Sequence, residues 1–323
     1  MAHNVKQLTA KNHAAKTKNQ FWSNVVKSRG LLLLLLPGTI ILLINNYLPM
    51  AGVVIAFQKS DYRKGLFGGD FVGLKNFEFF FKTDFAALIT RNTLLYNLAF
   101  ILVGTLVALF FAAVLSELRN KFAKKIYQTI ILLPYFMSWV VVSYIVFSLF
   151  GSDYGFINTQ LFPLLGIEPV SWYTQQKYWP FLLIFFNTWH GVGYSSIVYL
   201  AAITNMDAAL YEAAFIDGAS KWQQFSRITL PLLKPIIIIM TLLAIGRIFN
   251  TDIGLFYSVP MDSGALYPVT STIDTYVYRT MASGIGDTNM AAAAGFYQSL
   301  VGFVFVVTVN LIVRKIDKAS ALF

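Results

Sequence analysis

The 323-residue sequence contains no cysteine, only three histidines and few charges. Without cysteine the chain has no disulfide bonds, no thiolate metal ligands and no cysteine nucleophile. His3 and His13 lie in a polar N-terminal stretch, which leaves one histidine for the rest of the chain, so we expect no histidine metal cluster. Charged residues make up 12% of the chain, whereas soluble domains average about 25%. Hydrophobic residues make up 57%, whereas soluble domains average about 45–50%. This composition indicates a protein that lies in a membrane.

The motifs of several enzyme classes are missing as well. The sequence has no G-x-x-x-x-G-K-[ST] stretch, the loop that cradles nucleotide phosphates in many ATPases. It has no G-x-S-x-G stretch and no pair of acids recognisable as a glycosidase site. We therefore expect neither enzyme activity nor a bound cofactor or metal in this chain.

Long apolar runs are the dominant feature of the sequence. A helix of roughly 20 apolar residues crosses the hydrocarbon core of a bilayer. Six runs reach about this length, and they predict an all-α membrane protein with six transmembrane helices at 31–57, 92–115, 126–150, 180–203, 234–256 and 291–313. The domain prediction is a basic N-terminal segment (1–29), a six-helix domain (30–318) and a short tail (319–323).

The distribution of Lys and Arg predicts the orientation of these helices. Residues 1–29 carry six basic residues and no acid. Lys and Arg recur in the segments 119–125, 206–233 and 314–318, whereas 151–179 and 257–290 hold one each. Because basic loops stay in the cytoplasm, both termini and the 206–233 loop are predicted to be cytoplasmic. The formal net charge of +10 is thus explained by membrane topology, and we expect no nucleic-acid partner.

The 206–233 loop contains a motif of two short helices joined by a tight turn. Asp207 is a suitable N-cap for the first helix, and Gly218 can take the positive φ that ends it. Ser220 and Gln223 have the spacing of a capping box at the start of the second helix. Pro231 and Pro235 are expected to break that helix before the next apolar run.

The stretch YEAAFIDGASKWQQFSRITLPLLKP (Tyr211–Pro235) resembles the EAA signature of permease subunits of binding-protein-dependent ABC importers. The matching positions are Glu212-Ala213-Ala214, Asp217-Gly218-Ala219, Phe225, Ile228, Leu230-Pro231 and Pro235. In that family the EAA loop supplies a coupling helix that docks in a cleft of the ATPase. The resemblance assigns ATPase coupling to Glu212, Ala213, Ala214, Asp217, Gly218 and Ala219. For Glu212 and Asp217 a role as helix-end charges and turn formers is an equal alternative.

The resemblance also implies a fold, partners and a location. It implies the type I importer permease fold in the bacterial inner membrane, surrounded by lipid. The expected partners are a second homologous permease, two ATPase subunits that hold ATP and Mg, and an extracytoplasmic solute-binding protein. The ending AAAAGFYQSLVGFVFVVTVNLIVRKID further resembles the oligosaccharide and polysaccharide branch, which includes the permease pair of the bacterial alginate importer. A saccharide substrate follows, either a uronate-containing glycan or a neutral oligosaccharide.

Polar residues within the apolar runs are candidates for a substrate cavity, because such residues are costly in lipid. Aromatic rings offer an apolar face to a sugar, and amides and hydroxyls bind its rim. The candidates are Tyr135, Trp139, Tyr144, Asn187, Trp189, Tyr194, Arg247, Asn250, Asp252, Tyr297 and Gln298. The alternative is that these groups hold helices together, and His190 is predicted to be structural.

Arg247 lies half way along the 234–256 run, where its charge needs compensation. It either pairs with Asp252 or with an acid of a partner chain, or it faces an anionic ligand. Two other protein classes remain as alternatives. A secondary transporter would use Asp252 as its ion site, and a membrane enzyme acting on lipid-linked sugars would need a catalytic acid or histidine set.

Overall fold

The computed structural model describes residues 27–59, 65, 67–282 and 287–316, and over these ranges the chain is helical, with no β-strand. The chain divides into two compact units, one ending at Val54 and one beginning at Ile55. Gln58 and Phe71 form an isolated antiparallel bridge within the second unit.

The first unit contains one long apolar helix. Helix α2 (Arg29–Leu42) continues through a π-helical turn (Leu43–Tyr47) into a 3-10 segment (Leu48–Phe57), whose last residues belong to the second unit. None of the residues of α2 is buried. The whole helical stretch has 29 residues and is long enough to cross a bilayer.

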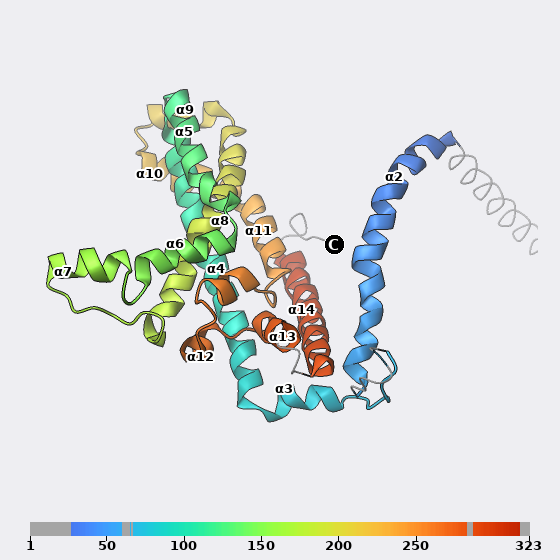
Figure 1. The fold of residues 1–323 in the computed structure, drawn as a ribbon. Coiled ribbons are helices and arrows are strands. Elements are labelled where there is room, and N and C mark those ends of the chain that lie inside the picture. The colour runs from blue at the N-terminus through green and yellow to red at the C-terminus, as the bar shows by residue number, and fades with distance from the viewer. Residues whose placement is uncertain (1–26, 60–64, 66, 283–286, 317–323) are drawn as a thin grey trace, which may run out of the picture. The chain divides into compact units, whose positions relative to one another are not determined.

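The second unit is organised around two long helices that pack along each other, α4 (Asp84–Glu117) and α8 (Trp179–Thr204) (Figure 1). Thr83 caps the start of α4, where its hydroxyl accepts a hydrogen bond from the Ala86 N–H. Small side chains let the two helices approach closely, since Ala108 and Ala112 are both fully buried in the shared core.

Helix α5 (Lys121–Leu132) and helix α6 (Trp139–Phe150) replace the single helix predicted at 126–150. A 3-10 turn (Leu133–Phe136) follows α5, and the chain then bends by 99° before α6, which crosses the direction of α4 and α8 in Figure 1. The bend has local causes, because Pro134 cannot donate a backbone hydrogen bond and the Ser138 hydroxyl caps α6 by accepting from the Val141 N–H.

The prediction that Pro231 and Pro235 break the helix is wrong. Helices α10 (Lys221–Gln224) and α11 (Leu230–Ile245) are joined by a π-helical turn (Phe225–Thr229) into one continuous helix of 25 residues. In the π turn the Leu230 N–H donates to the Phe225 carbonyl five residues earlier, which shifts the hydrogen-bond register. Pro231 therefore falls in the first turn of α11, where a backbone N–H is not required.

The same helix ends at Ile245, eleven residues before the predicted end of the 234–256 run. Turns follow, and a π-helical turn then spans Gly254–Ser258. The sequence pattern could not reveal this end, because the apolar residues Ile248 and Phe249 continue the apolar run beyond it. In the structure both are buried in an irregular segment.

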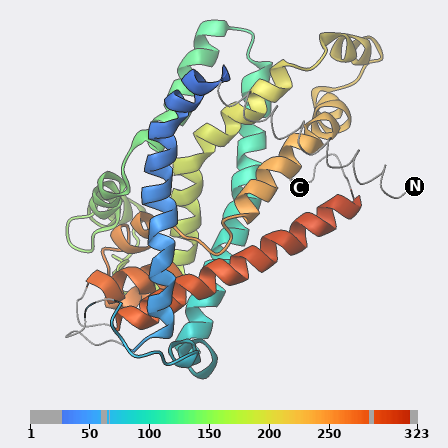
Figure 2. The same ribbon diagram turned by 90° about the vertical axis from the view of Figure 1, so that its right-hand side faces the viewer.

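Shorter elements complete the second unit. Helix α13 (Ile273–Ala282) packs against α14 (Thr288–Ile316), as Figure 2 also shows. The other elements are η3 (Lys75–Phe77), α3 (Glu78–Lys82), η5 (Ile157–Leu161), α7 (Phe162–Leu165), η6 (Gln176–Tyr178), α9 (Ala208–Ile216), η9 (Gly264–Leu266) and α12 (Tyr267–Thr270). The segment before α13 is tied to α4, since the Asn92 amide donates to the Ser271 carbonyl and the Thr93 hydroxyl accepts from the Ile273 N–H.

Four helical stretches are long and apolar enough to cross a membrane, and the bent pair α5–α6 makes a fifth if it counts as one span. The four are Arg29–Phe57, Asp84–Glu117, Lys221–Ile245 and Thr288–Lys315. The 26-residue α8 is long enough but is not among them. Six crossings and cytoplasmic termini therefore stay a prediction.

Candidate functional site

The EAA loop (206–233) folds as two helices around a glycine turn. The Asp207 carboxylate accepts a hydrogen bond from the Ala209 N–H at 2.9 Å and so caps α9. Gly218 has a φ of +76°, and the Ala219 N–H donates back to the Ala214 carbonyl at 2.9 Å, which closes the helix end.

The second helix of the loop starts with the predicted capping box. The Gln223 N–H donates to the Ser220 hydroxyl, and the Ser220 N–H donates to the Gln223 side-chain oxygen at 2.7 Å. These predictions are confirmed because both caps depend only on residues within three positions of each other.

The loop presents its signature residues at the surface of the chain. Glu212, Ala213, Asp217 and Gly218 are exposed, and Ala214 and Ala219 are half-buried. Sequence reasoning missed the apolar residues beside them: Phe215 is 74% exposed, Ile216 84% and Trp222 73%. The available signal was their apolar character in a loop predicted to lie outside the lipid. These three exposed apolar side chains of the EAA loop are here called the EAA patch (Phe215, Ile216 and Trp222).

Two contacts fix the EAA loop to the long helices. The Lys221 ammonium lies 2.7 Å from the Glu117 carboxylate at the end of α4. The Tyr211 hydroxyl of α9 shares a hydrogen bond of 2.9 Å with the Thr229 hydroxyl at the start of α11. The first contact links the EAA loop to α4, and the second links its two ends next to α11.

Two stacked pairs of rings, joined by a tilted contact, form a row where the α5–α6 bend meets α8. Trp139 stacks on His190 with ring centroids 4.3 Å apart, and Tyr135 stacks on Tyr194 at 5.2 Å. Tyr135 and His190 are 6.1 Å apart and join the two pairs. Tyr135 and Tyr194 are exposed, whereas Trp139 and His190 are half-buried. This aromatic row (Tyr135, Trp139, His190 and Tyr194) is a surface on which a sugar ring can stack.

Trp139 is held in one position by its neighbours. Its indole N–H donates to the Asp252 carboxylate at 2.8 Å, and the ring packs so closely on Gly254 that a Cβ there would lie 2.5 Å from the Trp139 Cβ. His190 contacts the Met137 carbonyl through Nε2 at 3.0 Å. The alternative in which Arg247 pairs with Asp252 is not observed, since the described residues contain no such ion pair and Asp252 accepts from Trp139 instead.

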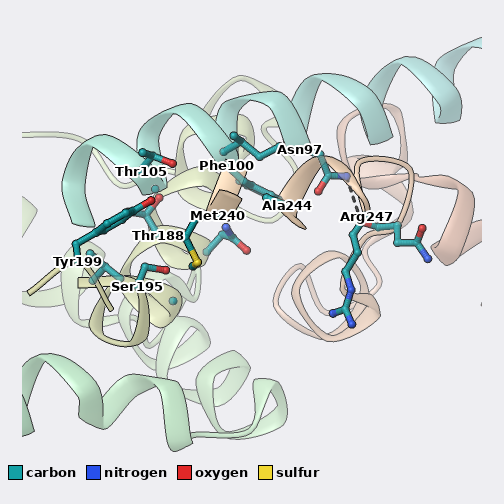
Figure 3. A pocket seen from close by; sticks show the side chains of 15 residues that line it. Asn97, Phe100, Thr105, Thr188, Ser195, Tyr199, Met240, Ala244 and Arg247 are labelled. Carbon is teal, nitrogen blue, oxygen red and sulfur yellow. Dashed lines mark hydrogen bonds between the residues drawn. The ribbon is translucent and has the colours of Figure 1, made fainter. Parts of the chain in front are cut away.

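Residues of α4, α8 and α11 and of the turn after α11 line an open cavity of about 340 Å³ (Figure 3). At one end the hydroxyl-bearing side chains of Thr105, Thr188, Ser195 and Tyr199 gather, and at the other lies Arg247 with Asn97. The lining is completed by Phe100, Ile101, Gly104, Asn187, Gly191, Val192, Met240, Ala244 and Asn250.

Arg247 does not lie inside a helix, because α11 has ended two residues earlier. The side chain is exposed to the cavity, and no carboxylate of the described residues forms an ion pair with it. Its backbone turn is tied to α4, as the Asn97 amide donates to the Asn250 carbonyl at 3.2 Å. A partner-chain acid and an anionic ligand remain as the two candidates for compensating its charge.

Of the predicted cavity residues, the structure brings Asn187, Arg247 and Asn250 to the cavity and Tyr135, Trp139, Tyr194 and Asp252 to the aromatic row. It places the other four elsewhere. Gln298 is buried and donates to the Phe249 carbonyl and the Asp274 carboxylate. Tyr297 packs against the core cluster that contains Ile89 and Phe249. Trp189 packs edge-on against Phe186, and Tyr144 lies 63% exposed on α6.

Sequence reasoning also missed cavity residues from α4. Asn97 and Thr105 lie in the apolar run 92–115, and Tyr199 and Met240 lie in other runs. A lone amide in an apolar run was a usable signal for Asn97, whereas Thr105 and Tyr199 look like ordinary helix residues until α4 and α8 are packed together.

Residues 101–318 match the family described as binding-protein-dependent transport system inner membrane component. The chain belongs to this family. It has the all-helical type I permease fold, and the match spans the EAA loop and the aromatic row.

Individual relatives cover almost the whole chain. The polygalacturonan/rhamnogalacturonan transport system permease protein YteP of Bacillus subtilis is 35% identical over 90% of this chain and 89% of its own length. The protein LplB of the same organism is 34% identical over 92% of each chain. A chain from the crystal structure of a bacterial ABC transporter involved in the import of the acidic polysaccharide alginate is 31% identical, with a TM-score of 0.82 over 92% of this chain and 99% of that one.

A second similar structure contains a periplasmic protein. In that crystal structure of the bacterial alginate ABC transporter, in complex with an alginate pentasaccharide-bound periplasmic protein, the matching chain has a TM-score of 0.81 and covers 92% of this chain. The likeness thus extends to a chain observed in complex with a periplasmic protein.

Proposed function

We propose that this chain is a membrane-spanning subunit of an ATP-driven importer in the bacterial inner membrane, which moves an oligo- or polysaccharide from a solute-binding protein into the cell by alternating access. The observation that carries the proposal is the end-to-end similarity to YteP, a permease for polygalacturonan and rhamnogalacturonan. Family membership supplies the transport role, and the relatives supply the substrate class.

Energy for transport comes from partner ATPases, which hold ATP and Mg. The EAA loop is the contact to them, because its EAA patch leaves three large apolar side chains without cover in this chain. Large exposed apolar side chains that lie together mark protein–protein contacts. Glu212 and Asp217 flank this patch and add charge at its rim.

The substrate is an acidic saccharide. Galacturonan and alginate, the substrates in the names of two similar proteins, are both polymers of uronic acids. Arg247 in this chain faces a cavity without a carboxylate from the described residues, which supports an anionic ligand over an internal ion pair. A neutral oligosaccharide is the second candidate, supported by the aromatic row, which stacks on any pyranose.

The partners complete the assembly: a second homologous permease, two ATPase subunits and an extracytoplasmic solute-binding protein. The test is reconstitution of this complex in vesicles, with ATP hydrolysis measured against a panel of saccharides, each loaded on the binding protein. We expect acidic oligosaccharides to stimulate hydrolysis more than neutral ones of equal length. Stimulation by no saccharide at all, from a complex whose subunits are all present, would contradict the proposal.

A further inference from the structure

The cavity between α4, α8 and α11 contains a buried hydroxyl without a partner. Thr188 is 9% exposed, and its hydroxyl oxygen is buried and forms no hydrogen bond with the described residues. A helical threonine usually bonds the carbonyl four residues earlier, as Thr204 of the same helix does at 2.9 Å. A buried polar group without a partner is unfavourable, so a ligand atom that reached the Thr188 hydroxyl would remove this cost.

The cavity is chemically different at its two ends. Figure 3 shows the hydroxyls of Thr105, Ser195 and Tyr199 near Thr188, and the guanidinium of Arg247 at the far end. Thr105 is on α4, and Ser195 and Tyr199 are on α8. The Ser195 hydroxyl forms no side-chain hydrogen bond with the described residues and is free to bind a ligand.

Apolar side chains separate the two polar ends. Phe100, Met240 and Ala244 line the middle of the cavity. The cavity volume of about 340 Å³ lies within the range of about 300–1,000 Å³ found for small-molecule sites. A ligand that fits therefore has hydroxyls on one side, a carboxylate on the other and C–H faces between them.

We propose that this cavity binds one uronic acid unit of the transported saccharide, with its ring hydroxyls at Thr188 and Ser195 and its carboxylate at Arg247. A uronic acid matches all three zones of the lining, because a guanidinium binds a carboxylate through two parallel hydrogen bonds and the pyranose C–H groups pack on apolar side chains. This inference rests on the proposed function, and it assigns the site, the orientation of the sugar and the residues that select its charge.

The first experiment compares two variants in the full reconstituted complex. Uptake is measured for an acidic oligosaccharide and for the same oligosaccharide with its carboxylates reduced to alcohols. Arg247→Gln is expected to lower uptake of the acidic sugar roughly tenfold and that of the reduced sugar little, since one charge-assisted contact is lost. Thr188→Val keeps the side-chain shape and is expected to lower uptake of both sugars severalfold without lowering the melting temperature, because it removes an unpaired hydroxyl.

The matched controls are Arg119→Gln, an exposed arginine away from the cavity, and Thr204→Val on α8. Both should retain wild-type uptake. If Arg247→Gln keeps the wild-type charge preference, or if it lowers only the melting temperature, the assignment of the carboxylate site is wrong. If wild-type complex transports no saccharide of either kind, the proposed function itself fails, and the two failures are thereby distinguished.

A second experiment uses the absence of cysteine from this chain. Ser195→Cys introduces a single thiol into the cavity, and Ser148→Cys places one on the exposed side of α6 as a control. Acidic oligosaccharide, delivered by the binding protein in the presence of a non-hydrolysable ATP analogue, should slow alkylation of the Ser195→Cys chain at least severalfold and leave the control unchanged. Equal alkylation rates with and without sugar at both positions would overturn the proposal.

Discussion

Two glycines of α8 lie two residues apart and meet different surroundings. A Cβ added at Gly193 would lie 2.3 Å from the Ile131 carbonyl oxygen and 2.6 Å from the Leu132 Cα, so the backbones of α5 and α8 are in direct contact there. A Cβ at Gly191 would meet no atom within 4 Å. The backbone contact holds the end of α5 just before the 99° bend, next to the aromatic row.

Gly193→Ala is expected to push α5 away from α8 and to destabilise the protein by about 1–3 kcal/mol or more, because backbone atoms cannot move aside as a side chain can. The measurement is the thermal melting of the purified complex. Gly191→Ala is the matched control and should melt at or slightly above the wild-type temperature, since alanine favours a helix over glycine. Equal melting of the two variants would contradict the close contact.

The EAA loop shows how one residue sets the shape of an element. Gly218 adopts a φ of +76° and has no atom within 4 Å of the position of a Cβ, so the constraint on this position is conformational and not steric crowding. A β-branched residue in this conformation is strained by about 1–3 kcal/mol. The turn angle between α9 and α10 therefore depends on Gly218.

Gly218→Val is expected to distort this turn, so that ATP hydrolysis continues at its basal rate while sugar uptake falls at least several-fold. Asparagine tolerates positive φ better than other residues with a Cβ, and Gly218→Asn should therefore keep most of the uptake. The assay is uptake and ATP hydrolysis by the same vesicles at equal protein content. Normal uptake with valine would show that the turn angle does not matter for coupling.

A separate prediction concerns the EAA patch. Replacing Phe215 and Ile216 together by serine is expected to weaken binding of the ATPase subunits by at least tenfold, because large apolar side chains at the centre of an interface carry much of its binding energy. The measurement is the amount of ATPase that co-purifies with the tagged chain. Phe81→Ser is the control, since Phe81 is 81% exposed on α3 and outside the EAA loop. Retention of the ATPase at the wild-type amount would show that the patch is not the contact.

The local features of these elements could be predicted from the sequence, whereas the breaks in the long helices could not. The caps at Asp207 and Ser220 and the turn at Gly218 depend on near neighbours alone. The end of α11 at Ile245 depends on buried neighbours of Phe249, which the sequence does not place. For the site, the sequence identified Arg247 and the rings of Tyr135, Trp139 and Tyr194, but not the contribution of α4, which requires the packed structure.

At the scale of the whole molecule, α4 carries a stripe of exposed apolar residues along its length. The exposed residues at this three- to four-residue spacing are Leu95, Leu98, Leu102, Leu106, Phe110 and Val114. Residues at such spacing share one face of a helix. Lipid covers part of such a face, and in the proposed assembly the second permease covers the rest.

We expect a tagged version of this chain to co-purify with an equal amount of a second, homologous permease, and to transport nothing without it. Joint expression followed by purification and protein quantification tests this directly. The expected stoichiometry is one copy of each permease to two ATPase subunits. An active complex with two copies of this chain and no other permease would contradict the expectation.

The continuous helix from Lys221 to Ile245 joins the EAA loop to the turn that carries Arg247. At 1.5 Å per residue, its 25 residues span roughly 37 Å, so a tilt of about 5° at one end displaces the other end by about 3 Å. That distance is as long as a hydrogen bond. In the proposed assembly this helix is a lever, and a slight rocking motion at the ATPase contact would be enough to withdraw Arg247 from a bound carboxylate and release the sugar.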